Sequence, residues 1–133
     1  MVYLTLDDVL AIRDALAATR AAHGDGDRYG VRTLSGLLSA LAAPRRSAFG
    51  AELFPTLSAK AGALAFSLVQ NHPFWDGNKR IAAAALRQFV EHNAARLDAD
   101  DHALKLFTGG IARGQIRDEA LAEWAALHIV GAP

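Results

Sequence analysis

The chain has 133 residues, no cysteine, and 14 basic against 14 acidic side chains. Its length is enough for one domain with a buried core, and a hydrophobic content of 52% is typical of a globular chain. Without cysteine there are no disulfides and no thiolate metal sites, and a net charge of zero gives no field to attract nucleic acid. We therefore expect a single domain over residues 1–133 that does not bind nucleic acid directly.

The N-terminal stretch does not have the features of a targeting signal. Asp7 and Asp8 interrupt its first apolar run, which a secretory signal peptide would keep uncharged. No apolar run approaches the length that is needed to span a membrane. We expect a cytoplasmic protein without a membrane partner.

Apolar residues recur at helical spacing through most of the chain, beginning near the N-terminus. Thr5 and Asp8 have the spacing of a capping box at the start of a first helix, and the stretch 24–27 is expected to end that helix in a loop. A second apolar stripe follows Thr33 and is terminated by Pro44. Both patterns predict helices that pack one face on a common core.

Four further helical patterns follow along the chain. The third and fourth, 57–69 and 81–90, flank the most polar stretch of the sequence. Asp98 is expected to cap a fifth helix through 103–107, and the apolar positions of 121–127 mark a sixth. Because strand signals are scarce, the predicted fold class is all-α, a compact bundle of about six helices.

Residues 72–80 read His-Pro-Phe-Trp-Asp-Gly-Asn-Lys-Arg and lead directly into the fourth helical pattern. A helix N-terminus presents unpaired N–H groups and the positive end of a dipole, which together favour phosphate. Lys79 and Arg80 add full charges there, and because cations at this end oppose the dipole, they indicate a bound anion that offsets them. Gly77 lets the backbone approach a ligand closely. The segment therefore predicts a phosphate site at a helix start.

His72 and Asp76 provide groups for chemistry beside that site. Histidine is the side chain best suited to accept a proton near neutral pH, so His72 is a candidate general base. Asp76 can cap the following helix or bind magnesium, since both roles need a carboxylate at a helix start. Asn78 is either a capping residue or a phosphate ligand.

This segment resembles the signature of the Fic/Doc superfamily, His-Pro-Phe-x-Asp/Glu-Gly-Asn-Gly-Arg-x-x-Arg. Lys79 stands where the AMP-transferring Fic enzymes carry glycine, and Ala83 stands where they carry a second arginine. Asn-Lys-Arg is instead the form of the Doc (death-on-curing) branch, whose members are about as long as this chain. The positions that match the Fic signature are His72, Pro73, Phe74, Asp76, Gly77, Asn78 and Arg80.

The resemblance implies a Doc-type protein kinase, which transfers the γ-phosphoryl group of ATP, with Mg²⁺, to a Ser or Thr hydroxyl of a target protein. His72 would take the hydroxyl proton, Asp76 would hold the metal or the acceptor, and Lys79 would complete the catalytic set. The phosphates would be bound by the residues at the helix start, Gly77, Asn78, Lys79 and Arg80.

Two other functions stay open beside the kinase. Gly77 is shared with the AMP-transferring branch, which keeps transfer of AMP or another nucleotide to a protein hydroxyl as the second hypothesis. The third is a binding module without catalysis that retains the loop as a relic. The mass of the group added to a target separates the first two, and failure to bind any nucleotide would favour the third.

The resemblance also implies partners. Doc-like toxins are paired with a small Phd-like antitoxin, whose disordered tail folds as a helix onto the toxin and neutralises it. The first helix or the apolar stripe at 34–41 could supply a groove for such a tail. The family's target class is a translation elongation GTPase, so arrest of protein synthesis is the expected outcome.

Residues 44–56 contain Pro44, Gly50 and Pro55, which indicate a loop with room for a short hairpin. In Fic-like proteins a flap in this part of the chain aligns a target segment beside the active site by strand addition. An ordinary solvated loop is an equally good interpretation of this composition.

Overall fold

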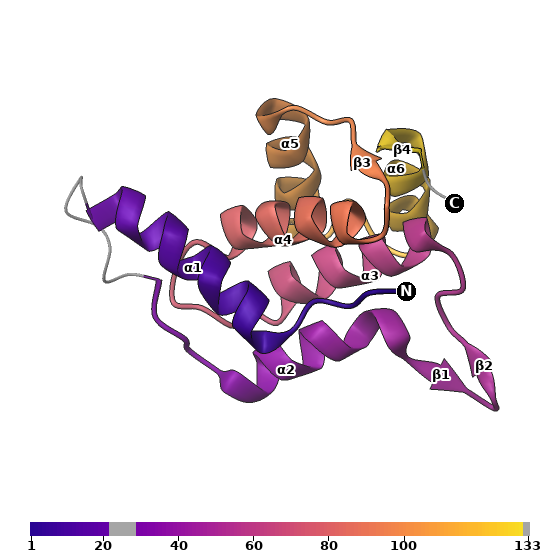
Figure 1. Ribbon diagram of the computed structural model, residues 1–133, viewed down its shortest axis with the longest axis horizontal. Helices are drawn as coiled ribbons and strands as arrows, with labels where there is room; N and C mark the ends of the chain where they lie inside the picture. Colours follow the sequence, from indigo (N-terminus) through magenta and orange to yellow (C-terminus); the bar gives the residue numbers. More distant parts are fainter. Residues whose placement is uncertain (22–28, 132–133) are drawn as a thin grey trace.

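Six α-helices make up most of the chain that the computed structural model describes, residues 1–21 and 29–131 (Figure 1). The predicted all-α class with about six helices is therefore confirmed, whereas the loop expected at 24–27 lies outside the described residues. In chain order the helices are α1 (Leu6–Ala21), α2 (Leu34–Ala42), α3 (Leu57–Gln70), α4 (Asn78–His92), α5 (Asp101–Ala112) and α6 (Glu119–His128).

Helix α3 lies at the centre and contacts α2, α4, α5 and α6. All of its positions from 60 to 69 except Phe66 are buried, as expected of a helix that has neighbours on every side. Small residues allow these neighbours to come close: a Cβ on Gly62 would lie 2.9 Å from the Cβ of Leu121 in α6. The polar stretch 72–80 therefore follows directly from the most enclosed helix of the bundle.

Side chains cap the first three helices, and the sequence singled out those of the first two. At α1 the Thr5 N–H donates to the Asp8 carboxylate at 2.8 Å, and the Asp8 N–H donates to the Thr5 hydroxyl at 3.1 Å, which is a capping box. The hydroxyls of Thr33 and Thr56 each accept a backbone N–H three residues further on, at 3.1 Å. These local patterns fix the starts of α1, α2 and α3.

The cap expected for the fifth helix was placed two residues too early. Asp100 caps α5 by accepting the Ala103 N–H at 2.8 Å. Asp98 instead follows β3 (Arg96–Leu97) and donates its backbone N–H to the His128 carbonyl at 2.6 Å. It is drawn away from the helix because β3 pairs antiparallel with β4 (Ile129–Val130), a contact between distant segments that no local pattern indicates.

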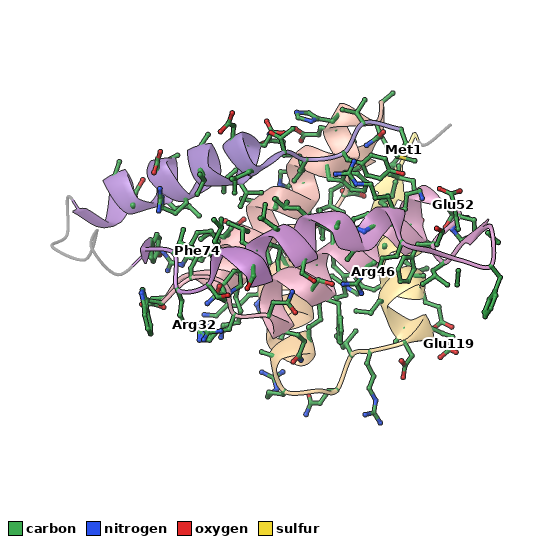
Figure 2. The ribbon with its side chains drawn as sticks, turned by 90° about the horizontal axis from the view of Figure 1, so that it is seen from below. Met1, Arg32, Arg46, Glu52, Phe74 and Glu119 are labelled. Atoms are coloured by element: carbon green, nitrogen blue, oxygen red, sulfur yellow. The ribbon has the colours of Figure 1, made fainter. Side chains whose placement is uncertain are left out.

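A short antiparallel hairpin lies within residues 44–56, as the composition allowed. Its strands are β1 (Ser47–Ala48) and β2 (Ala51–Glu52), and the 3₁₀ turn η2 (Ala43–Arg45) precedes them. The hairpin lies at the opposite end of α3 from the 72–80 stretch (Figure 1). Figure 2 shows the same separation, with Glu52 near one end of the molecule and Phe74 near the other.

Within 1–21 and 29–131, none of the helices combines the length and the apolar character that crossing a membrane would require.

Candidate active site

The loop between α3 and α4 carries the predicted site and is held in a strained shape. Phe74 is completely buried in the core, whereas the neighbouring Trp75 is exposed. His72 has a φ of 48° and Gly77 a φ of 80°, both in the left-handed region. For a residue with a side chain this region costs roughly 1–3 kcal/mol. The backbone at His72 therefore needs its surroundings to hold it.

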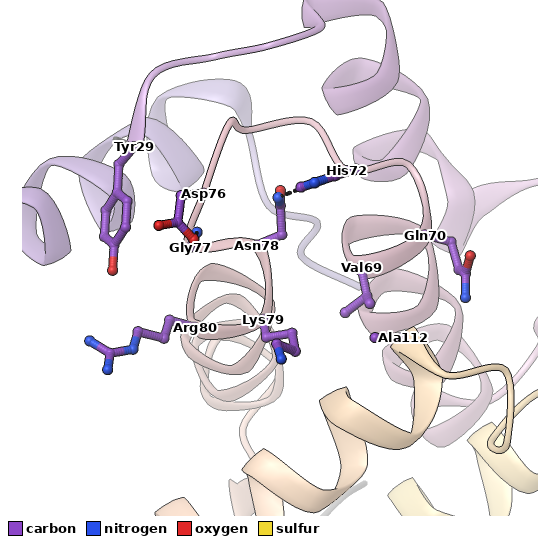
Figure 3. Close-up of a pocket in the computed structure, with 10 residues that line it drawn as sticks. All are labelled: Tyr29, Val69, Gln70, His72, Asp76, Gly77, Asn78, Lys79, Arg80 and Ala112. Carbon is purple, nitrogen blue, oxygen red and sulfur yellow. Dashed lines mark hydrogen bonds between the residues drawn. The ribbon is translucent and has the colours of Figure 1, made fainter. Parts of the chain in front are cut away.

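The side chain of Asn78 points back into this loop (Figure 3). Its Oδ1 accepts the Phe74 N–H at 3.0 Å, and its Nδ2 donates to the Phe74 carbonyl at 2.8 Å. The same Nδ2 lies 2.5 Å from Nδ1 of His72. Both hydrogens of the amide are thus used within the loop, so the side chain of Asn78 neither caps α4 nor has a hydrogen left for a phosphate.

These bonds also decide which nitrogen of the His72 ring carries the proton. The paired bonds to Phe74 fix which end of the Asn78 amide is the nitrogen, so Nδ1 of His72 must be the acceptor. A neutral imidazole with an accepting Nδ1 has its proton on Nε2. The ring is oriented by Asn78, and its one lone pair is engaged in that bond.

The start of α4 has no side-chain cap. Its N-cap residue is Gly77, and the Asp76 Oδ1 accepts the Gly77 N–H at 2.7 Å without reaching the helix. The first N–H groups of any helix have no acceptor within it. Lys79 and Arg80 are exposed in this first turn, and within the described residues neither takes part in an ion pair.

Tyr29 explains why a glycine stands before α4. The ring of Tyr29 is buried against Gly77, and a Cβ added there would lie 2.6 Å from Cε1 of the ring. The positive φ of Gly77 would strain any other residue as well. This close contact holds the start of α4 against the segment that follows α1.

All the predicted site residues line one pocket of about 400 Å³ (Figure 3). The structure thus brings together the base, the carboxylate and the helix start, while their chemical roles stay predictions. The predicted residues in the lining are His72, Asp76, Gly77, Asn78, Lys79 and Arg80, and the residues that the sequence did not indicate are Tyr29, Val69, Gln70 and Ala112.

Those additional residues come from α3, from the end of α5 and from the segment before α2. Gln70 donates from Nε2 to the Ile111 carbonyl at 2.7 Å, which fixes the end of α5 beside the pocket. Ala112 follows in the lining. The sequence did not indicate that Gln70 and Ala112 line the pocket, because the bond between Gln70 and Ile111 joins residues that are far apart in the chain.

Mg²⁺ fits this donor set only if the nucleotide supplies further ligands. No group of three His, Asp or Glu side chains that could hold a metal occurs in residues 1–21 and 29–131. Asp76 keeps one carboxylate oxygen that accepts no bond from the protein in this part of the chain. Mg²⁺ is commonly bound by one or two carboxylates together with substrate phosphates and water, so the single acid is sufficient.

A second, wider groove of about 770 Å³ adjoins the pocket between α1, α4 and α5. Lys79 and Arg80 line both spaces, so they stand at the junction. Ala83, where the Fic signature has its second arginine, lines the groove and adds no charge to it. The cations nearest to the pocket are therefore those of the first turn of α4.

A helical bundle with a histidine loop and an uncapped, cationic helix start defines a class of proteins suited to bind phosphate groups. The family model described as Fic/DOC family matches residues 3–90, which include the whole loop. The chain belongs to the Fic/DOC family, and to its Doc branch.

A relative supports the same assignment. The protein named Toxin Doc from Mycolicibacterium smegmatis is 38% identical over 98 residues, which cover 74% of this chain and 69% of that protein. A search of solved structures gave no significant match.

Proposed function

We propose that this protein is the toxin of a toxin–antitoxin pair and transfers the γ-phosphoryl group of ATP to a Ser or Thr hydroxyl of a target protein. The observation that carries the proposal is the uncapped start of α4, whose cations face the same pocket as His72 and Asp76. The name of the M. smegmatis relative supports the toxin part. The phosphoryl transfer rests on the site and on the Doc form of the motif.

In the proposed step the oxygen of the acceptor hydroxyl bonds to the γ-phosphorus, the bond from that phosphorus to the β,γ-bridging oxygen breaks, and ADP leaves. Lys79, Arg80 and the free N–H groups of α4 neutralise the phosphate charge, and Asp76 would hold Mg²⁺, which would supply further positive charge to the phosphates. These residues do little covalent chemistry; they position the reactants and balance charge.

His72 accepts the proton of the attacking hydroxyl. Because Nδ1 accepts the bond from Asn78 in the free protein, the lone pair of the ring is not available until that amide moves away. We therefore propose that arrival of the acceptor and nucleotide displaces the Asn78 amide from the ring. Until then the lone pair of the ring is engaged and His72 does not act as a base.

Transfer of AMP or another nucleotide is the second candidate. It is favoured by Gly77, which the AMP-transferring branch shares. Against it, Lys79 replaces the glycine of that branch and its side chain lines the pocket, where it occupies space next to the helix start. Ala83 also leaves the outer phosphates without a second arginine. A module without catalysis would not explain why a base and a carboxylate share the pocket.

We further propose a Phd-like antitoxin whose disordered tail folds on the toxin, and a translation elongation GTPase as the target. Of the two candidate surfaces for the tail, α2 has the clearer apolar face, because Leu34 and Leu38 are 52% and 47% exposed. The hairpin of β1 and β2 does not line the pocket and lies at the far end of α3, which does not support a flap beside His72.

Labelled ATP distinguishes the candidate reactions. The purified protein is incubated with Mg²⁺, a bacterial lysate and ATP labelled at either the α- or the γ-phosphorus. We expect label in a target protein from γ-labelled ATP only. Transfer of label from α-labelled ATP would establish nucleotide transfer instead. If no label is transferred and calorimetry detects no nucleotide binding, the protein is a binding module without catalysis.

The role of His72 is tested by His72→Ala in the same assay and in a bacterial growth assay. We expect loss of transfer and of growth arrest with an unchanged unfolding transition, because His72 is exposed and contributes little to the core. His92→Ala, at the other end of α4, is the matched control and should behave like the wild type. A toxic His72→Ala protein would overturn the role of the base.

A further inference from the structure

The loop that carries His72 is paired directly with residues 30–33, the segment that leads into α2. The backbone N–H groups of Arg32 and Thr33 both donate to the Pro73 carbonyl, at 2.7 and 3.1 Å. The Trp75 N–H donates to the Gly30 carbonyl at 3.0 Å. This short extended segment therefore holds the loop by its backbone, immediately after the strained position 72.

The side chain of Arg32 extends this pairing to the strained residue itself. Its Nε donates to the His72 carbonyl at 2.7 Å, and its Nη2 donates to the Asn71 carbonyl at 3.1 Å. Asn71 is the C-cap of α3, where carbonyl groups are left without helical partners. A guanidinium there pairs two carbonyls at once and complements the negative end of the helix dipole.

The backbone carbonyl and the ring of His72 are thus held by two different residues. Arg32 fixes the carbonyl from outside, and Asn78 fixes the ring from inside. Arg32 is not among the residues that line the pocket. Its bonds to the site are those to the carbonyls of His72 and Asn71, both of which lie in the backbone.

We propose that Arg32 is a positioning residue: it keeps the backbone of His72 in the left-handed region and so sets where the imidazole stands relative to the helix start of α4. The expected effect of Arg32 on the rate of transfer rests on the proposed function. The geometric part, that Arg32 determines the position of the ring, does not depend on which group is transferred.

Three variants separate positioning from general stability. Arg32→Met removes both donors and keeps a long side chain, and Arg32→Lys keeps the charge but cannot bond both carbonyls in a fixed fork. Arg96→Met is the matched control, since Arg96 is an exposed arginine beyond the far end of α4 that pairs only weakly with Asp98 at 3.6 Å. The free energy of unfolding is measured for all three.

Kinetics of transfer from ATP to the target then give a signature that loss of stability does not produce. For Arg32→Met we expect kcat to fall roughly ten- to hundredfold, because small misplacements of a reacting group have effects of this size. The KM for ATP should stay within about twofold, because Arg32 does not line the pocket. Arg32→Lys should recover part of kcat, and Arg96→Met should equal the wild type. Equal losses in kcat and ATP affinity, or no loss at all, would overturn the proposal.

Nuclear magnetic resonance tests the geometric part without any turnover. In Arg32→Met the ring signals of His72 and the side-chain amide signals of Asn78 should shift and broaden, because their mutual bond depends on the place of the loop. Arg96→Met should leave both unchanged. If the wild type transfers no phosphate but these shifts occur, the proposed function fails and the positioning role stands. If Arg32→Met leaves the signals in place, the positioning role fails whatever the activity.

Discussion

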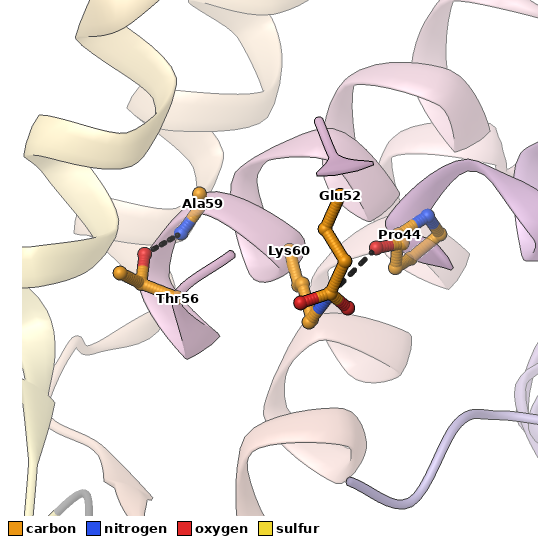
Figure 4. Close-up of polar contacts among 5 residues, drawn as sticks. All are labelled: Pro44, Glu52, Thr56, Ala59 and Lys60. Carbon is orange, nitrogen blue, oxygen red and sulfur yellow. Dashed lines mark hydrogen bonds and ion pairs between the residues drawn. The ribbon is translucent and has the colours of Figure 1, made fainter. Parts of the chain in front are cut away.

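The consecutive helices α3 and α4 differ in how the protein treats the polar groups at their starts. At α3 the Thr56 hydroxyl accepts the Ala59 N–H at 3.1 Å (Figure 4). Lys60, in the same turn region, is 2% exposed, and its ammonium donates to the Glu52 carboxylate at 2.8 Å and to the Pro44 carbonyl at 3.2 Å. The Ala59 N–H and the Lys60 ammonium thus both find partners inside the protein.

At α4 the same kinds of group are left without internal partners. Gly77 offers no side chain to the free N–H groups, and in the described part of the chain neither Lys79 nor Arg80 pairs with a carboxylate. The contrast shows that this fold can neutralise a lysine close to a helix start when it serves only structure. Leaving the cations of α4 unpaired keeps that start available to an anion from outside.

The largest effect is expected where α4 begins. Gly77→Ala places a Cβ 2.6 Å from the Tyr29 ring and forces a residue with a side chain to a φ of 80°. We expect the free energy of unfolding, measured with urea, to fall by about 3 kcal/mol, and nucleotide binding to be lost. Gly50→Ala is the control, because its φ is 78° but nothing lies within 4 Å of the added Cβ. Equal losses of unfolding free energy in the two variants would show that the contact with the Tyr29 ring does not matter.

The next effect concerns the neutralised lysine of α3. Lys60→Ala should lower the free energy of unfolding by about 2 kcal/mol, because it leaves a cavity and an unpaired carbonyl, while the partner Glu52 is half-exposed and can be solvated. Lys105→Ala, on the surface of α5, should change it by less than about 0.5 kcal/mol. A stable Lys60→Ala protein would show that the hairpin does not depend on this anchor.

The part of this contribution that depends on the charge of Lys60 should also be lost in alkali. Burial by itself would lower the pKa of Lys60, but the interactions of its ammonium with Glu52 and Tyr3 outweigh burial and raise that pKa. A raised folded pKa means that the stabilisation is complete below the unfolded pKa of lysine, about 10.4, and is lost as the pH rises through the folded value. The difference in stability between wild type and Lys60→Ala should therefore be constant near neutral pH and shrink above about pH 10.5.

Replacing Lys79, the unpaired lysine of α4, should weaken the binding of nucleotide and raise the stability of the fold. Lys79→Met should weaken binding of Mg-ATP, measured by calorimetry, about tenfold, because a charge-assisted bond to phosphate is lost. It should raise the free energy of unfolding by about 0.5 kcal/mol, because a cation at a helix start opposes the dipole. Lys105→Met is the control for both measurements. Unchanged affinity with lower stability would make Lys79 a structural residue.

The last effect concerns the cap of α3 and is confined to stability. Thr56→Ala removes the hydroxyl that accepts the Ala59 N–H and should cost about 1 kcal/mol of unfolding free energy. Thr56→Ser keeps the acceptor and should recover most of that loss. Neither variant should change transfer, since Thr56 lies at the far end of α3 from His72. A change in transfer with Thr56→Ala would mean that the two ends of α3 are coupled.

The elements that the sequence predicted are those whose signals are local. The capping box of Thr5 and Asp8 and the helix that follows Thr33 depend on residues within three positions of each other, and both are present. The error at Asp98 arose because its place is decided by a ladder between distant strands.

The candidate site, like the helices, was predictable only where the signal lies in neighbouring residues. The motif placed the base, the carboxylate and the phosphate-facing residues together, because they follow one another in the chain. It did not indicate that the amide of Asn78 would turn toward His72, nor that Tyr29 and Arg32 would support the loop. The contacts of Tyr29 and Arg32 join residues about 40 or more positions apart, such as Arg32 and His72, and only the packed fold reveals them. Asn78 and His72 are six positions apart, but their contact depends on how the loop folds back on itself.

One wall of the pocket comes from Ala112, at the end of α5, held there by the bond between Gln70 and the Ile111 carbonyl. This wall lies beyond residue 90, where the family match ends. The loop of residues 72–80 and this wall of the pocket are therefore encoded in separate stretches of the gene. Substitutions in the last third of the chain can change the shape of the pocket while the loop stays as it is.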